Sequence, residues 1–376
     1  MNGFNVSGSY QVFTCFKIAG AGTGFNVSSG VSNVDITDNY IDGQGTGSPG
    51  VGVNFPSISQ TRPSNIYVAR NYITRTVYGF IISCKTCTFE DNEINNMVND
   101  SSSDSGADLD YTRVFGDSIT LRHNYLHGNN QPDCKGADCH MDCFQTWNIG
   151  NAGESATNIT IDRNTCFNAN EGIIARDTSS GTYGSYASHY NWTVTNNVIG
   201  HSPFSDSRGM PWVALFEHVG NVVFDNNTCL DAGLVGYLNG AQATTHRNNI
   251  HYFNGWQPYS PSVNSWNDGK ILAADHNLLY DSGQNYSATS YPNDTRNVDP
   301  KFMSPTTDAT PTSEGDWRLS TTSPAKDTGA TISAVNVDHN SVSRPQGTAF
   351  DIGAYEFASG GTQTLQPPTN VQAVVH

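Results

Sequence analysis

The stretch NVDITDNYI, residues 33–41, decides the fold, because similar phrases recur along the chain. Each copy alternates apolar and polar residues and then has Asn, one further residue and an apolar residue. The shortest interval between copies is 21 residues and the widest is 40. Aligned in this way, nine copies place the following residues in register: Asn39, Asn71, Asn92, Asn124, Asn164, Asn197, Asn227, Asn248 and Asn277.

A repeat of about 20 residues with alternation inside it predicts a solenoid of parallel strands. Equivalent positions of successive coils would then lie about 4.8 Å apart. Asn tolerates the left-handed backbone of a tight corner, and stacked Asn side chains can hydrogen-bond to one another. We therefore predict an asparagine ladder at one corner of the coils, with loops inserted wherever the interval is longer.

The composition supports an all-β protein and argues against a membrane span and a nucleic-acid partner. Only 14% of the residues are charged, and abundant Gly, Asn, Ser and Thr weaken helices and favour turns. No apolar run approaches the about 18 residues of a membrane span. The formal net charge of −16 argues against nucleic acid as a partner. We expect a monomer with no nucleic-acid partner and no membrane span.

The eight cysteines indicate disulfides or buried thiols rather than a zinc site. Cys84 and Cys87 are close in sequence, as are Cys134 and Cys139, but no later pair completes a zinc ligand set. We predict a disulfide between Cys134 and Cys139 that holds the widest insertion. The opening MNGFNVSGSY has no basic start or apolar core, so we expect that any signal peptide was removed.

The repeat, together with DWRLSTTSPAKDTGA (316–330) and RPQGTAFDIGAYEF (344–357), resembles the right-handed parallel β-helix proteins of the pectate-lyase-like superfamily. The resemblance implies an all-β fold, a single-stranded right-handed parallel β-helix (solenoid) with loop insertions, over residues 1–357. Its C-terminal part is similar to the last coils of many secreted bacterial β-helix proteins. Residues 358–376 read as a linker and the first strand of a fibronectin-type module. The resemblance also implies a secreted, carbohydrate-active protein.

Insertions carry function in a solenoid, and three successive intervals hold clusters of reactive side chains. If Met141 faces the interior, the side chains of His140 and Asp142 should point outward together. We predict that the three clusters line one groove, with Gln145, Trp147 and Trp212 binding substrate. The candidate catalytic residues are His140, Asp142, Glu171, Arg176, Asp177, Glu217 and His218.

Two enzymatic hypotheses fit these residues. A polysaccharide lyase needs the uronate carboxylate neutralised, which calcium bound by Asp138, Asp142 or Asp177 could do. Its base would be a histidine more readily than Arg176, because an unperturbed arginine is a poor base. An inverting glycoside hydrolase would instead use a pair of the carboxylates, about 6.5–9.5 Å apart.

Structural interpretations stay open beside these two. The charged side chains could form exposed ion pairs on polar loops, or Asp138 and Asp142 could hold a structural calcium ion. A non-catalytic adhesin or glycan-binding stalk would also use this fold. The clustering on successive coils favours a glycan-cleaving enzyme, and the first hypothesis is a calcium-assisted lyase acting on a uronate-containing glycan.

Overall fold

The computed structural model describes residues 3–20, 22–44, 50–98, 109–129, 141–151, 153–169, 171–177, 188–200, 212–230, 234–253, 262–265, 269–281, 291–306 and 315–358. These residues form strands, turns and irregular segments, and no helix occurs among them. Within the same ranges there is consequently no helix that could cross a membrane. The prediction of an all-β fold is confirmed.

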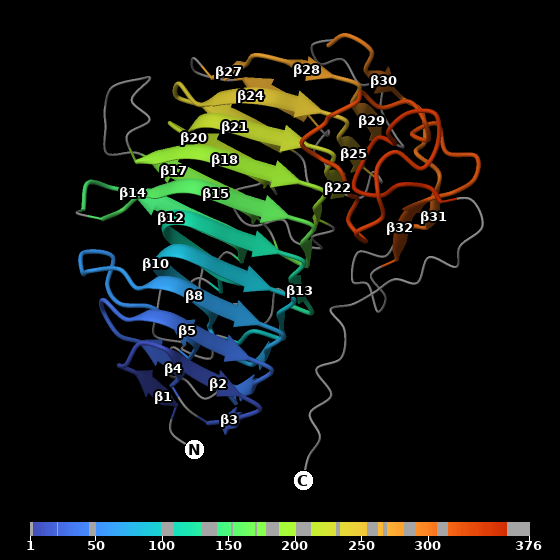
Figure 1. The fold of residues 1–376 in the computed structure, drawn as a ribbon. Coiled ribbons are helices and arrows are strands. Elements are labelled where there is room, and N and C mark those ends of the chain that lie inside the picture. Colours follow the sequence, from blue (N-terminus) through green and yellow to red (C-terminus); the bar gives the residue numbers. More distant parts are fainter. Residues whose placement is uncertain are drawn as a thin grey trace.

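The strands form the three sides of a coil (Figure 1). Sheet 1 contains β1 (Phe4–Val6), β4 (Thr23–Val27), β7 (Val51–Asn54), β14 (Asp142–Asn148), β17 (Glu171–Asp177), β20 (Trp212–Glu217), β23 (Leu234–Leu238) and β26 (Ser262–Ser265). Sheet 2 contains β2 (Gln11–Thr14), β5 (Ser32–Thr37), β8 (Ser64–Ala69), β15 (Ala156–Asp162), β18 (His189–Thr195), β21 (Gly220–Asp225), β24 (Gln242–Arg247), β27 (Lys270–Ile271) and β28 (Ala274–Asp275). Sheet 3 contains β3 (Lys17–Ala19), β6 (Tyr40–Asp42), β9 (Tyr72–Thr74), β11 (Glu93–Asn95), β13 (Tyr125–His127), β16 (Thr165–Phe167), β19 (Val198–Gly200), β22 (Thr228–Leu230), β25 (Ile250–Phe253), β29 (Leu278–Asp281) and β30 (Thr295–Arg296).

Each strand of a sheet pairs in parallel with its counterpart in the next coil, as β5 does with β8 and β6 with β9. The strands β10 (Tyr78–Glu90) and β12 (Thr112–Arg122) are long enough to run through sheets 1 and 2 without a break. The chain therefore winds as a right-handed parallel β-helix, the hand that parallel crossovers adopt. This confirms the predicted fold class.

A ladder of buried asparagines joins the coils where sheet 2 turns into sheet 3. The side-chain Oδ1 of Asn71 accepts hydrogen bonds from the backbone N–H of Asn39 (3.1 Å) and from its Nδ2 (2.9 Å). The Nδ2 of Asn39 also donates to the carbonyl of Phe13, one coil earlier. The same pattern repeats up to Asn277, whose N–H donates to the carboxylate of Asp294. Since these groups are buried, each coil depends on the next to satisfy its backbone.

The prediction that Asn248 belongs to the ladder was wrong. Asn227 donates to Asn249, and Asn249 donates to Asn277, whereas Asn248 lies outside the ladder. The pairing of β21 with β24 shifts register by one residue after Val222, so every later position in this coil moves by one. His251 consequently takes a buried interior position and lies 3.2 Å from His246, nitrogen to nitrogen.

The left-handed residue at this corner is the one before each ladder asparagine, which corrects the sequence-based expectation. Asp38, Arg70, Asp91 and Arg163 have φ between 53° and 59°, and none of the ladder asparagines has a positive φ. Asn248, with φ of 55°, occupies this preceding position. The ladder asparagines are therefore required for hydrogen bonding and not for backbone conformation.

Two disulfides occur among the described residues. Cys84 and Cys87 are joined within β10, and Cys143 of β14 is joined to Cys166 of β16 across the interior. The sequence did not indicate the second bond. It ties a strand of sheet 1 to sheet 3 and closes a loop of 23 residues, a size worth about 3 kcal/mol of stability. The predicted bond between Cys134 and Cys139 lies outside the described residues.

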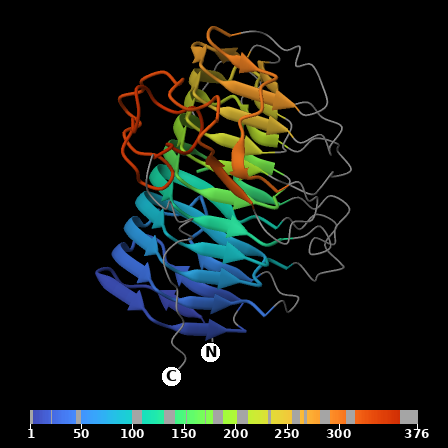
Figure 2. The ribbon, with the colours of Figure 1, turned by 90° about the vertical axis from the view of Figure 1, so that its right-hand side faces the viewer.

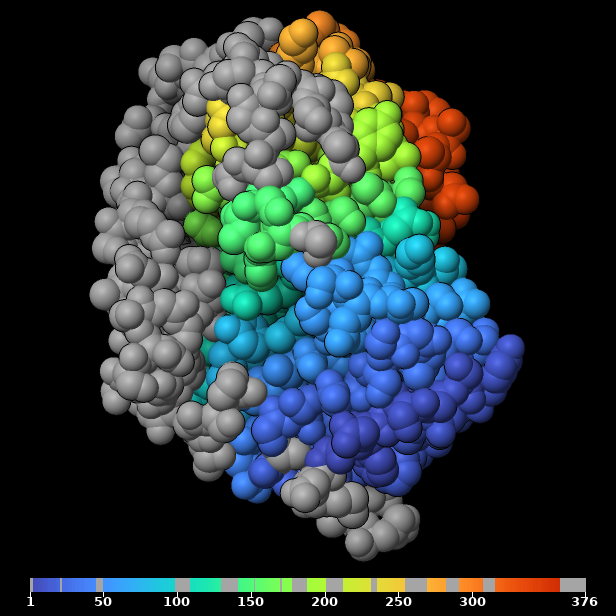
Figure 3. All heavy atoms as spheres, turned by 90° about the vertical axis from the view of Figure 1, so that its left-hand side faces the viewer, coloured from blue at the N-terminus to red at the C-terminus, as the bar shows by residue number. Residues whose placement is uncertain are grey.

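The coils end near Arg296, which corrects the expectation that residues 299–357 form the last coils. This C-terminal segment folds back along the outside of sheet 3, beside the coils drawn in green and yellow (Figures 1 and 2). In the space-filling view its red atoms lie above the blue N-terminal coils (Figure 3). Its antiparallel strands β31 (Phe302–Ser304) and β32 (Asp316–Leu319) supply Trp317 and Phe302 to a second apolar core with Leu230 and Ile250 of sheet 3. Residues 359–376 lie outside the described part, so the linker and module stay predictions.

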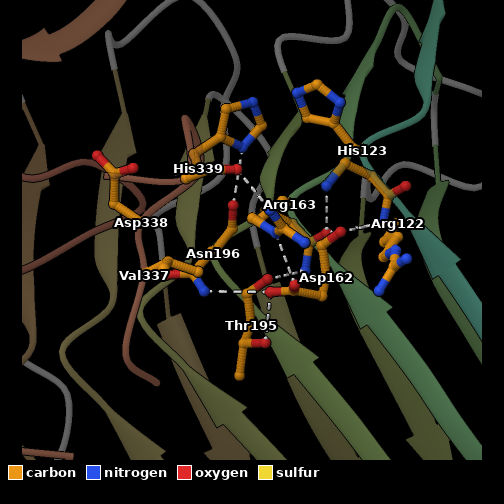
Figure 4. A network of polar contacts seen from close by, with 12 residues as sticks. Arg122, His123, Asp162, Arg163, Thr195, Asn196, Val337, Asp338 and His339 are labelled. Atoms are coloured by element: carbon orange, nitrogen blue, oxygen red, sulfur yellow. Dashed lines mark hydrogen bonds and ion pairs between the residues drawn. The ribbon is translucent and has the colours of Figure 1, made fainter. Parts of the chain in front are cut away.

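Consecutive asparagines in the sequence mark where this segment docks. The first Asn of each pair, Asn196, Asn226 and Asn248, projects from the left-handed corner position. Asn248 exchanges two hydrogen bonds with the backbone of Ala330, both 2.8 Å, and Asn226 donates to the carbonyl of Asp351. The ring of His339 contacts the carbonyl of Asn196 at 2.8 Å (Figure 4). In the N-terminal coils the same position holds charged residues that pair with each other, such as Asp38 and Arg70.

We predict that acid destabilises the protein through its buried histidines. Burial lowers the pKa of His189, His251 and His339 from 6.5 to about 4. The unfolded chain therefore binds more protons between these values, so stability present above pH 6.5 is lost as the pH falls toward 4. Each histidine contributes about 3 kcal/mol to this loss. Burial raises the pKa of Asp351 to about 6, which acts in the opposite direction.

Denaturant unfolding at several pH values measures this dependence. The variant His339→Asn should show a shallower pH dependence between pH 6.5 and 4 than the parent protein. An identical pH dependence in the two proteins would contradict the assignment of His339.

Candidate active site

The outer face of sheet 1 carries three rows of side chains, with one residue of each row in every coil. Phe144, Ile173 and Ala214 fill the interior behind it. The acidic row consists of Asp110, Asp142 and Glu171, and Trp212 follows in register. The central row consists of Arg113, Gln145, Ile174 and Leu215. The lateral row consists of Phe115, Trp147, Arg176 and Glu217.

The acidic row places three carboxylates on consecutive coils. Asp142 pairs directly with Glu171, and its carbonyl accepts from Tyr111 N–H just as that of Asp110 accepts from Gly79 N–H. Their backbones therefore lie about 4.8 Å apart per coil. Asp110 and Asp142 are completely buried, while Glu171 is partly exposed. Equal charges at this spacing repel each other, which is the kind of arrangement found at functional sites.

Arg113 neutralises one end of this row. Its Nε donates to the Oδ2 of Asp110 at 2.5 Å. The guanidinium carbon lies 4.3 Å from the ring centroid of Tyr78 and 5.2 Å from that of Trp147. Stacking and an ion pair together fix the orientation of this side chain. The sequence prediction missed Tyr78, Asp110 and Arg113, which belong to the two coils before the predicted groove.

Contacts with two residues fix the orientation of the Trp147 ring in the lateral row. Its ring is nearly perpendicular to that of Phe115, with the two ring centroids 4.8 Å apart, and its indole N–H donates to the Oε1 of Glu154 at 3.2 Å. The other carboxylate oxygen of Glu154 accepts the backbone N–H groups of Ile149 and Asn151. The Glu154 contacts hold the turn after β14 against the indole. An aromatic ring fixed in this way is suited to contact a sugar.

Arg176 and Glu217 are brought together as expected from their positions on successive coils. The Nε of Arg176 lies 2.7 Å from the Oε2 of Glu217, and Asn239 donates to the other oxygen. Arg176 is 49% exposed, whereas Glu217 is 9% exposed. Solvent screens the ion pair, so its contribution to stability is below about 1 kcal/mol. Glu217 is nevertheless well ordered by two donors.

Asp177 and His218 do not belong to the three outer rows. Both are buried where their strands of sheet 1 end. The Nδ1 of His218 contacts the backbone carbonyl of Asp177, so this ring nitrogen carries the proton and donates. The structure thus gives His218 a positioning contact at the sheet corner.

Met141 and Cys143 face the interior, as the predicted outward direction of Asp142 requires. His140 and Asp138 lie outside the described residues, so their places in the groove stay predictions. Within the described ranges no three His, Cys, Asp or Glu side chains form a metal-binding group. Calcium binding by Asp138, Asp142 or Asp177 stays a prediction.

Comparison with known proteins found similar solved structures at low sequence identity. No family model and no curated protein matches the sequence. A GH87 alpha-1,3-glucanase catalytic unit from Streptomyces thermodiastaticus is 15% identical, with 78% of this chain and 52% of that one covered and a TM-score of 0.48. Pectate lyase Pel9A is 15% identical, with 93% of this chain and 97% of that one covered and a TM-score of 0.35. PfbA, a surface adhesin of Streptococcus pneumoniae, is 11% identical, with 78% of this chain and 79% of that one covered and a TM-score of 0.38. This chain spans about half the length of the glucanase structure.

Proposed function

We propose that this protein is an extracellular enzyme that hydrolyses glycosidic bonds of a polysaccharide on the outer face of sheet 1. The observation that carries the proposal is the acidic row, in which three successive coils present carboxylates beside fixed aromatic rings. The two disulfides are consistent with an oxidising compartment outside the cell.

The acidic row supplies the groups that hydrolysis needs. A glycoside hydrolase uses one carboxylic acid to protonate the leaving oxygen and a second carboxylate as base or nucleophile. We assign proton donation to Asp142, which is shielded from solvent, and the role of the second carboxylate to Glu171, which solvent can reach. Asp110, which is paired with Arg113, would stabilise developing positive charge on the sugar.

The separation of the acting carboxylates determines the stereochemistry. Groups about 5–5.5 Å apart retain the anomeric configuration, and groups about 6.5–9.5 Å apart invert it. Carboxylates on adjacent coils of the acidic row, about 4.8 Å apart at the backbone, approach the separation for retention. Carboxylates two coils apart approach the separation for inversion. The anomeric form of the first product, followed by NMR, identifies which pair acts.

Hydrolysis is tested against elimination by product analysis on a panel of polysaccharides. We expect new reducing ends without an unsaturated uronate, and activity that persists in a calcium chelator. An unsaturated product whose formation stops in chelator and recovers with calcium would instead establish the lyase, with Asp138 and Asp142 as calcium ligands. A melting curve recorded in chelator separates a catalytic effect from a loss of stability.

A further inference from the structure

Gln145 occupies the centre of the candidate active site. It lies in the central row between Arg113 and Ile174, on the strand that also carries Asp142 and Trp147. The residue is only 8% exposed. Among the described residues, nothing donates a hydrogen bond to its buried Oε1. A buried acceptor without a donor is unfavourable, and such groups are typical of places where a ligand supplies the partner.

The guanidinium group of Arg113, the neighbouring cation, is engaged with residues other than Gln145. Arg113 is the register neighbour of Gln145, but its Nε is engaged with Asp110 and its guanidinium lies against Tyr78 and Trp147. These contacts orient Arg113 along the acidic row. The amide oxygen of Gln145, a residue of the central row, is thus left as an acceptor without a donor among the described residues.

The charges around Gln145 select the kind of group that can reach it. The three rows carry the acidic side chains of Asp110, Asp142, Glu171 and Glu217, of which Asp142 is the proposed proton donor, and the two guanidinium groups of Arg113 and Arg176, both of which are already paired. A uronate carboxylate would meet like charges here and offers no proton to the amide oxygen. A sugar hydroxyl donates a hydrogen bond and carries no charge.

We propose that the site takes a neutral, hydroxyl-bearing glycan and that Gln145 is its specificity-determining residue. One sugar unit lies beside Trp147 and donates a hydroxyl hydrogen bond to the Oε1 of Gln145, which holds the adjacent glycosidic bond over the acidic row. This inference rests on the proposed function, since it concerns the substrate of the same site.

The experiment compares oligosaccharides of neutral sugars with oligouronates on the full chain. We expect cleavage of a neutral glycan and none of the oligouronates. Gln145→Met keeps the length of the side chain and removes the acceptor, so KM should rise at least about tenfold with a smaller change in kcat. Thr146→Val is the matched control, because its hydroxyl is also buried without a partner but faces away from the site. Its KM should stay at the parent value.

Three outcomes are distinguishable. Hydrolysis of oligouronates with equal or greater kcat/KM overturns the inference and leaves the proposed hydrolysis intact. An unchanged KM in Gln145→Met overturns the role of Gln145. If no polysaccharide is cleaved, the proposed function fails, and binding of neutral and acidic glycans to the parent protein, measured by affinity electrophoresis, still tests the preference: tighter binding of acidic glycans contradicts it.

Discussion

Replacing Asp142 by Asn should lower glycan-cleaving activity by at least about 10²-fold, the usual loss when acid–base help is removed. The change keeps the size of the side chain and removes its ionisable proton. The backbone carbonyl that binds Tyr111 N–H and the strand pairing to Glu171 are unaffected. We therefore expect the circular dichroism spectrum and melting temperature to stay close to those of the parent protein. Initial rates on the best substrate measure the effect.

The control is Asp35→Asn, which changes a partly exposed carboxylate of β5 on sheet 2. Its activity should equal that of the parent protein. Full activity in Asp142→Asn would show that the acidic row is structural. The search for catalytic groups would then move to Glu217 and Arg176, which are held together 2.7 Å apart in the lateral row.

Replacing Asn164 by Leu should destabilise the β-helix by about 4 kcal/mol, since buried groups that lose their partners cost about 1–3 kcal/mol each. The Oδ1 of Asn164 accepts from the N–H and the Nδ2 of Asn124. Its Nδ2 donates to the carbonyl of Leu121 and to the Oδ1 of Asn197. Leucine has a similar volume, so the loss reports hydrogen bonding and not a cavity. Denaturant unfolding at pH 7.5 measures it.

The matched control lies in a second, exposed row of asparagines on sheet 2. Asn158 accepts a hydrogen bond from Asn191 and donates to Asp117, and its φ is 54°. Asn158→Gly keeps this left-handed backbone accessible and removes only exposed hydrogen bonds, so we expect a loss below about 1 kcal/mol. Equal losses of unfolding free energy in the two variants would mean that burial does not increase the contribution of the inner ladder to stability.

The sequence by itself determined the coil. Three features of the repeat predict the coil: its period, the alternation within each copy and the recurring asparagine. Each coil needs that asparagine, because its side chain satisfies the backbone of the neighbouring coil. The same pattern located the strands that hold Asp142, Glu171 and Glu217, since equivalent positions of a solenoid necessarily stack. The position of these residues on one face was therefore open to prediction.

Only the tertiary structure decided the features that depend on contacts between distant segments. The register shift in β24 moved the ladder from Asn248 to Asn249, because a single extra residue was accommodated between sheets 1 and 3. The bond between Cys143 and Cys166 and the ion pair of Arg113 with Asp110 follow from how side chains meet after coiling. Residues 299–357 leave the coil because the outer face of sheet 3 is apolar there, and burying that face beside Trp317 and Phe302 is more favourable than exposing it to water.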